Sequence, residues 1–239
     1  ERNPKSDLNG DDVKSKIQIL SSLAFQCFIN KSNITVEGIQ AIDDVDIHNA
    51  KVLGYKIKHL AIAELKKNRL IQRVHPCMIK KDSYISNING VLNAVIIEGN
   101  PIGKFTMQGE GAGPGPTTSA LVSDICSILR GNIKFPFSIP HKSRKKIKSN
   151  DISNEYFSSY IRLDVIDKTG VLSSITKILS KHKISVKRLI QNPFKSKKFA
   201  SIIIISHKAK NTNLVRSISE LANKKFVINK PKFFRIEDI

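Results

Sequence analysis

The amino-acid sequence predicts an α+β protein built in two parts. Its 239 residues are 40% hydrophobic, enough for one large core or two smaller ones. Helix and strand periodicities mix along the first part and restart after a stretch rich in proline and lysine. We therefore expect a mixed-sheet domain over residues 1–131, a basic linker over 132–153 and a smaller α+β domain over 154–239.

The first part opens with helical spacing. Within residues 11–28, apolar side chains recur three or four positions apart, which predicts a helix that buries this stripe. The stripe consists of Val13, Ile17, Leu20, Ala24 and Cys27. The pattern of residues 48–68 predicts a second helix, interrupted by Gly54.

Strand signals follow this second helix. Residues 70–79 form one predicted strand, and residues 93–99 and 102–109 form a predicted hairpin. A glycine-rich loop and a helix over residues 117–130 close the first part, with Gly131 as the helix C-cap.

The second part has a simpler order. Strand and amphipathic helix patterns alternate as β-α-β-β-α-β, which is the ferredoxin-like arrangement. The segments are 158–167, 170–182, 184–192, 199–207, 211–224 and 233–238.

The loop over residues 109–115 holds four of the chain's 12 glycines. Glycine costs conformational entropy on folding, so this concentration needs a reason. One interpretation is a flexible turn after the hairpin. The other is a loop whose backbone approaches a phosphate or a cofactor before a helix N-terminus. The loop matches neither the Rossmann fingerprint nor the P-loop.

Composition limits the partners. The net charge of +20 raises nucleic acid as a candidate, but the lysines are scattered and no aromatic-basic motif accompanies them. We expect only salt-sensitive, non-specific association with nucleic acid. The longest apolar run, FASIIIIS, is too short to span a bilayer, and no signal peptide is visible. These observations predict no membrane partner and a cytoplasmic location.

The three cysteines are isolated. Cys27, Cys77 and Cys126 lack CxxC spacing, and the histidines form no ligand pairs. This pattern argues against a disulfide framework and against a metal site. Buried thiols in a reducing compartment are the simpler interpretation.

In the second part, the stretch LDVIDKTGVLSSIT ends a strand in Asp167 and opens a helix with Gly170. It resembles the ACT domain, a small-molecule sensor of amino-acid biosynthetic enzymes. The resemblance implies an effector site at Asp167 and Gly170, where free helix N–H groups meet an amino acid's carboxylate. It suggests threonine as the inhibitor and pairing into a homo-oligomer, since such a domain leaves a sheet face or edge to cover. Without the resemblance, these two residues could simply form a turn.

The first part resembles homoserine dehydrogenase of the bacterial type. The matching stretches are DLNGDDVKSKIQILSSLAF, VEGI, LGYKIKHLAIA, VHP, NGVLNAV and GAGPGPTTSALVSD. One departure is Glu110, where many family members carry proline. The family interconverts aspartate 4-semialdehyde and homoserine with NADP or NAD, in the synthesis of threonine, methionine and isoleucine.

The resemblance also implies site residues. Lys16 matches the family's proton donor, and Glu1 and Asp12 match carboxylates that hold the substrate. Gly111, Ala112 and Gly113 match the loop beside the nicotinamide, with Gly113 the contacting position. Sequence alone favours an ordinary ion pair for Asp12 and Lys16, which lie four positions apart on one helix.

No Rossmann fingerprint precedes these residues, so the resemblance leads us to expect a fragment that is inactive without its nucleotide-binding domain. The alternative is a non-catalytic module that binds amino acids through its ACT domain. Whether NAD or NADP is preferred stays open.

Overall fold

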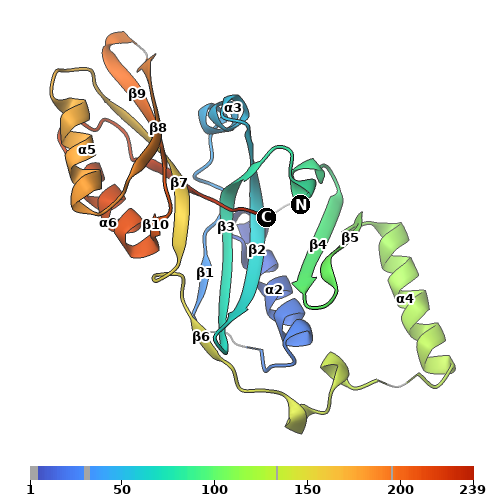
Figure 1. Cartoon of the computed structure of the whole chain (residues 1–239). Helices are drawn as coiled ribbons and strands as arrows, with labels where there is room; N and C mark the ends of the chain where they lie inside the picture. Colours follow the sequence, from blue (N-terminus) through green and yellow to red (C-terminus); the bar gives the residue numbers. More distant parts are fainter. Residues whose placement is uncertain (1–4, 30–32, 133, 195) are drawn as a thin grey trace.

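A computed structural model describes residues 5–29, 33–132, 134–194 and 196–239. The first part contains four helices and five strands among these residues, with a short 3-10 turn before the hairpin (Figure 1). Its elements are α1 (Lys5–Asn9), α2 (Asp11–Ala24), β1 (Ile34–Val36), α3 (Asp44–Val52), β2 (Tyr55–Lys66), β3 (Arg69–Lys80), η1 (Tyr84–Asn87), β4 (Leu92–Gly99), β5 (Gly103–Glu110) and α4 (Pro114–Leu129).

The remainder of the chain carries the basic segment and the second part. Its elements are η2 (Pro136–Ser138), η3 (His141–Ser143), β6 (Lys148–Asn150), β7 (Tyr156–Ile166), α5 (Val171–Lys181), β8 (Val186–Phe194), β9 (Ser196–Ser206), β10 (Ala209–Lys210), α6 (Asn211–Ala222) and β11 (Lys232–Ile236). The order β7-α5-β8-β9-α6-β11 confirms the predicted β-α-β-β-α-β pattern, with the short β10 added. The strands lie in the order β11-β7-β9-β8.

The predicted helix over residues 48–68 is wrong. Only its first residues are helical, in α3, and Gly54 then turns the chain with a φ of 84°. Strand β2 follows and pairs antiparallel with β3 along its whole length. The two-residue turn at Lys67 and Asn68 has positive φ at both positions, which is the geometry that favours tight hairpins. Cross-strand pairing therefore overrides the helical spacing.

The first helix is shorter than expected and buries a different face. Helix α2 ends at Ala24 and buries Ile17, Ser21 and Ser22, while Leu20 is exposed. The Gln72 amide donates a hydrogen bond to the Ser21 hydroxyl at 2.9 Å, so the buried face is partly polar. The predicted strand over 70–79, the hairpin β4–β5 and the helix α4 are confirmed, and Gly131 follows α4 with a φ of 71°.

One continuous sheet joins the two parts. Strand β11, the last of the chain, pairs antiparallel with β7 and parallel with β3. Strands β1, β11 and β6 all pair with β3, which pairs with β2 through its other edge. The end of the second part is thus built into the sheet of the first, as Figure 1 shows.

The second part's sheet is covered on both faces. Its main core lies under α5 and α6 and includes Leu163, Ile175 and Leu214. On the other face Tyr160, Ile203 and Phe234 pack with Ala50 of α3. Because both faces are covered within this chain, a second copy is not needed to cover a sheet face, which was one reason to expect pairing. Among the described strands, β8 pairs with β9 and with no other, so its second edge is unpaired there.

The segment after α4 is more than a solvated linker. The Arg144 guanidinium donates to the Cys27 carbonyl oxygen at 2.9 Å and lies over the rings of Phe28 and Phe137. Strand β6 then pairs with the start of β3. This basic segment docks along the first part, although most of its lysines are exposed.

Charged side chains are buried where the two parts meet. Arg162 of β7 is 4% exposed and donates to Asp46 of α3 at 2.7 Å. The Tyr160 hydroxyl donates to the same carboxylate at 2.9 Å. Burial raises the pKa of Asp46, and the hydrogen bonds from Arg162 and Tyr160 oppose that shift.

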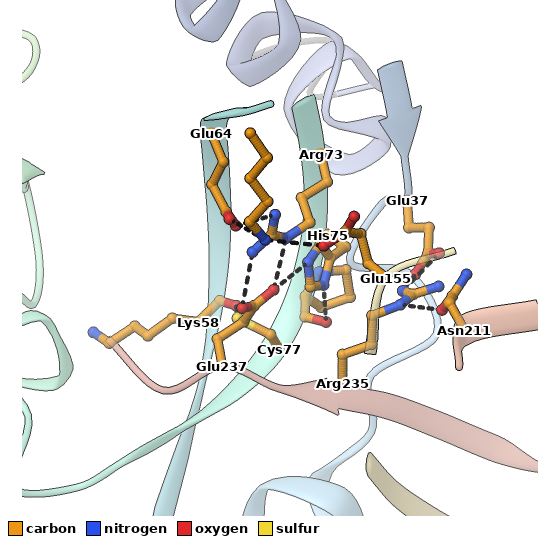
Figure 2. Close-up of polar contacts among 12 residues, drawn as sticks. Glu37, Lys58, Glu64, Arg73, His75, Cys77, Glu155, Asn211, Arg235 and Glu237 are labelled. Carbon is orange, nitrogen blue, oxygen red and sulfur yellow. Dashed lines mark hydrogen bonds and ion pairs between the residues drawn. The ribbon is translucent and has the colours of Figure 1, made fainter. Parts of the chain in front are cut away.

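A second buried group surrounds β11 (Figure 2). Glu237, next to the end of this strand, accepts hydrogen bonds from Arg73 at 2.8 Å and from His75 at 3.1 Å, both on β3. Arg235 reaches Glu37, with its Nη1 atom 2.9 Å from both carboxylate oxygens. The junction is therefore held by polar contacts as well as by strand pairing.

The Glu237 contacts give a pH-dependent prediction. Burial would raise the pKa of Glu237, but hydrogen bonds from His75 and Arg73 outweigh it and hold the pKa at about 2, against an ordinary value of 4.5. This difference corresponds to about 3 kcal/mol of stability, present above pH 4.5 and lost as the pH falls towards 2. Glu237→Gln should lower the free energy of unfolding at pH 7 by about that amount and remove this acid dependence.

Urea denaturation at several pH values measures both effects. Glu98→Gln is the matched control, because Glu98 lies in an exposed pair with Lys104 at 3.8 Å. Exposed pairs contribute about 0–1 kcal/mol. Equal losses in the two variants would contradict the buried role of Glu237.

Candidate active site

The candidate catalytic helix, α2, begins at a tightly packed turn. Gly10 has a φ of 84° and precedes the helix, and a Cβ atom there would lie 3.1 Å from the His59 ring. Gly38 packs closer still, since its Cβ would lie 2.3 Å from the Leu8 carbonyl oxygen. The amide of Ile39 donates to that oxygen at 2.9 Å. The positive φ of Gly10 and the close backbone approach at Gly38 therefore favour glycine at both positions and fix where α2 starts.

His59 links this turn to the next segment. Its Nε2 atom lies 3.0 Å from the carbonyl oxygen of Glu37. Burial lowers the pKa of His59, so the ring is neutral at pH 7, and Nε2 carries the hydrogen because a carbonyl oxygen only accepts. The stretches DLNG, VEGI and KIKHLAIA, far apart in the sequence, therefore meet at this turn.

Asp12 and Lys16 project from the first two turns of α2. Lys16 Nζ lies 2.7 Å from Asp12 Oδ2, and the two side chains are 62% and 42% exposed. The ion pair expected from their spacing is confirmed, and its exposure leaves both groups open to a small molecule. Glu1, the other predicted substrate ligand, lies outside the described residues. The backbone oxygen of Asp7 accepts from the Gly10 amide at 3.2 Å, so Asp7 belongs to the entry turn.

The glycine-rich loop lies between β5 and α4. Gly113 has a φ of 123° and immediately precedes α4, so a side chain there would be strained. The nearest atoms to a Cβ on Gly111 would be those of the exposed side-chain amide of Asn93, which can move away. Ala112 is exposed. Gly113 is thus the position where the backbone conformation itself demands glycine, and the open loop allows a flat group to approach.

Helix α4 itself is apolar and exposed. None of its residues is buried, and Leu129 is 80% exposed. Figure 1 shows α4 beside the hairpin at one side of the molecule. Its exposed large apolar side chains are Leu121, Val122, Ile125, Ile128 and Leu129. A surface of this kind is typical of one that another protein segment covers.

The candidate effector site occupies the start of α5. Gly170 has a φ of 90° and precedes the helix, which suits its predicted position. The Asp167 carboxylate accepts a hydrogen bond from Gln191 of β8 at 3.3 Å. Both residues are exposed, so free N–H groups of α5 and a carboxylate lie near each other at the surface.

A cavity of about 420 Å³ opens between the two parts, close to the start of α2. None of the predicted site residues that the structure describes lines it. Its lining consists of Asn9, Glu37, Gly38, Gln40, Ala41, Pro76, Phe233 and Phe234.

The described part of the chain offers no group of three or more His, Cys, Asp or Glu residues placed to hold a metal ion. All three cysteines are free, and Cys126 is only partly buried. Among the described helices, none combines the length and apolar character that a membrane span requires.

Comparisons with known proteins fit this arrangement. The family model for homoserine dehydrogenase matches residues 1–126, more than half of the chain, and the model for the ACT domain matches residues 159–224. The chain belongs to the homoserine dehydrogenase family. A homoserine dehydrogenase of Helicobacter pylori is 36% identical over all of this chain and 56% of its own length. One of Pseudomonas aeruginosa is 31% identical over 92% of this chain and 52% of its own length.

A solved structure agrees with the family assignment. The homoserine dehydrogenase of Thiobacillus denitrificans aligns with 98% of this chain and 55% of its own chain, at a TM-score of 0.87 and 31% identity. That of Staphylococcus aureus aligns at a TM-score of 0.68 and 21% identity, which supports the fold. The chain spans about half the length of the relatives it matches.

Sequence reasoning missed the roles of three residues around the turn. Glu37 and His59 lie within the quoted stretches VEGI and LGYKIKHLAIA, but nothing in their spacing indicated that they meet. Arg235 lies at the far end of the chain, and only the pairing of β11 with β3 brings it to Glu37.

Proposed function

We propose that this chain carries the substrate-binding and regulatory parts of a homoserine dehydrogenase. The reaction is the NAD(P)-dependent interconversion of L-aspartate 4-semialdehyde and L-homoserine, on the route to threonine, methionine and isoleucine. The observation that carries the proposal is the packed turn at Gly10, where three family-matching stretches meet and from which α2 presents Asp12 and Lys16 to solvent.

The roles of these residues follow from the chemistry. Reduction of the aldehyde carbon leaves negative charge on its oxygen, which needs a cation or a proton donor. Lys16 supplies both, because its ammonium group can move from Asp12 to that oxygen and give up a proton. Asp12 and Glu1 bind the substrate's hydroxyl and ammonium groups, since carboxylates form strong charge-assisted hydrogen bonds.

The glycine-rich loop fits one part of a dinucleotide, the nicotinamide ring. The strained Gly113 and the open loop from Gly111 let a flat ring approach the backbone at the start of α4. The nicotinamide cofactor, NADP or NAD, supplies or accepts the hydride when bound. The glycine-rich loop between β5 and α4 does not match the Rossmann fingerprint, and in this proposal a further segment holds the phosphates. The exposed apolar side chains of α4 suit a contact with such a segment.

A location in the cytoplasm and a homo-oligomeric state belong to the same proposal. Three free thiols suit a reducing compartment. The exposed Ile19 and Leu23 on α2 and the free edge of β8 are surfaces that a second copy could cover.

An activity assay tests this function. We define the chimera as this chain joined to the part of the Helicobacter pylori relative that it does not match. Homoserine-dependent reduction of NADP or NAD by the chimera is the expected result. A folded chimera without this activity, but with amino-acid binding by the chain, would favour the non-catalytic ACT module.

Threonine is the proposed effector, bound at Asp167, Gly170 and the first turn of α5. Gly170→Val should weaken threonine binding at least tenfold, because the β-branched side chain cannot easily adopt a φ of 90° and would crowd the ligand's carboxylate. Calorimetry on the whole chain is the suitable measurement, since β11 depends on β3 for part of its pairing. Serine and lysine serve as control ligands. Equal threonine affinity in the variant would contradict the proposed site.

A further inference from the structure

The contacts of Glu37 connect the last strand of the chain to the start of α2. Its carboxylate is held by Arg235 of β11, with Nη1 at 2.9 Å from both oxygens. Its backbone oxygen lies 3.0 Å from Nε2 of His59, and its amide donates to the Val74 carbonyl at 2.8 Å. Glu37 therefore touches both parts of the molecule at once.

The two residues after Glu37 clamp the turn that precedes α2. Gly38 packs against the Leu8 backbone without room for a Cβ atom, and Ile39 donates to the same Leu8 oxygen. The His59 ring also packs against Gly10. A shift of Glu37 must consequently move the residues that fix where α2 begins.

Polar contacts, rather than dense packing, hold Glu37 in place. The cavity of about 420 Å³ lies directly against Glu37 and Gly38, so one side of this segment lacks close neighbours. Arg235, by contrast, is firmly seated. It is 3% exposed, donates to Asn211 at 2.9 Å and lies over the rings of Phe157 and Phe233.

We infer that Glu37 is a positioning residue for the Asp12–Lys16 pair. Arg235, fixed in the second part, tethers Glu37, and Glu37 holds the Gly10 turn through His59 and through the clamp on Leu8. The sheet that carries the candidate effector site thereby sets the position of the candidate catalytic helix. The importance of that position for reaction rests on the proposed function, whereas the tether itself does not.

Glu37→Gln tests the tether on the chain as it exists. The variant keeps the side chain's shape but leaves the buried Arg235 charge without a carboxylate. Hydrogen exchange of the Lys14 and Ile39 amides, which bond to Gly10 and Leu8, should become at least about tenfold faster, with a smaller change for β9 amides. In Glu37→Asp, the exchange rates of the Lys14 and Ile39 amides should lie between those of the parent chain and those of Glu37→Gln. Glu98→Gln should change exchange neither at these amides nor in β9. An equal change in all regions, or none, would overturn the inference.

Kinetics of the chimera separate the tether from the proposed function. Misplacement of reacting groups lowers rate more than affinity, so Glu37→Gln should reduce kcat for homoserine about tenfold while KM for the cofactor is unchanged. Faster local exchange with unchanged kcat would support the tether and contradict the catalytic assignment of α2. Unchanged exchange, with a large kcat loss in Lys16→Ala, would overturn the tether and leave the proposed function standing.

Discussion

Lys16→Ala should lower kcat of the chimera for homoserine oxidation by about a hundredfold or more. The substitution removes the group proposed to stabilise and protonate the substrate oxygen. KM for homoserine should change less, because Asp12 and Glu1 still bind the substrate. The fold should survive, since the Lys16 side chain is 62% exposed and, among the described residues, forms its ion pair with Asp12 on the same helix.

Two further variants sharpen this test. Lys16→Arg keeps the positive charge, but its guanidinium cannot give up a proton at neutral pH. An intermediate kcat would therefore separate charge stabilisation from proton donation. Lys14→Ala is the matched control on the same helix, because the Lys14 amide donates to the Gly10 oxygen at 2.9 Å and alanine keeps this backbone bond. If steady-state kinetics give Lys16→Ala and Lys14→Ala the same kcat, Lys16 is an ordinary surface residue and its proposed role is wrong.

Arg162→Met should reduce the free energy of unfolding by about 3–5 kcal/mol at pH 7. Arg162 is 4% exposed, and its guanidinium contacts Asp46 at 2.7 Å, Asp43 at 2.5 Å and Asp164 at 3.4 Å. Methionine fills much of the space but supplies no charge. The wholly buried Asp46 would then keep the Tyr160 hydroxyl as its remaining side-chain donor, and its carboxylate would be poorly solvated.

The loss in Arg162→Met should depend on pH in a defined direction. Without the guanidinium, burial raises the pKa of Asp46 further, so the folded variant favours the protonated carboxyl. The difference in free energy of unfolding between the variant and the parent chain should therefore be smallest near pH 4 and should grow as the pH rises to 8. Arg69→Met is the control, because Arg69 is exposed and contacts Asn150 at 3.2 Å. Urea denaturation showing a loss below 1 kcal/mol, or no pH trend, would contradict the buried network.

Local patterns predicted the second part well. Its two helices carry clear apolar faces, and Ile175, Leu179 and Leu214 are buried against the sheet as the spacing indicates. The helix prediction for residues 48–68 was wrong because helical and strand spacings overlap in a run such as IKHLAIAEL. What decides the structure there is the positive φ of Lys67 and Asn68 and the long partner strand β3.

The junction could not be predicted from the sequence. Arg162, Arg235 and Glu237 resemble ordinary surface charges in a chain where 25% of residues are charged. The burial of Arg235 and Glu237 follows from the pairing of β11 with β3, whereas Arg162 is buried against Asp46 of α3. No local pattern encodes these long-range contacts. The Asp12–Lys16 pair, in contrast, depends only on helical spacing and was predicted as an ion pair. Its catalytic role comes from the family resemblance and stays a proposal.

In the proposed enzyme, α2 binds the substrate through Asp12 and Lys16. A crystal structure of the chimera with L-homoserine and NADP tests it most directly. We expect the homoserine hydroxyl oxygen within about 2.6–3.2 Å of Lys16 Nζ, with Asp12 beside it. Homoserine bound elsewhere, with Lys16 paired only to Asp12 in solvent, would contradict it.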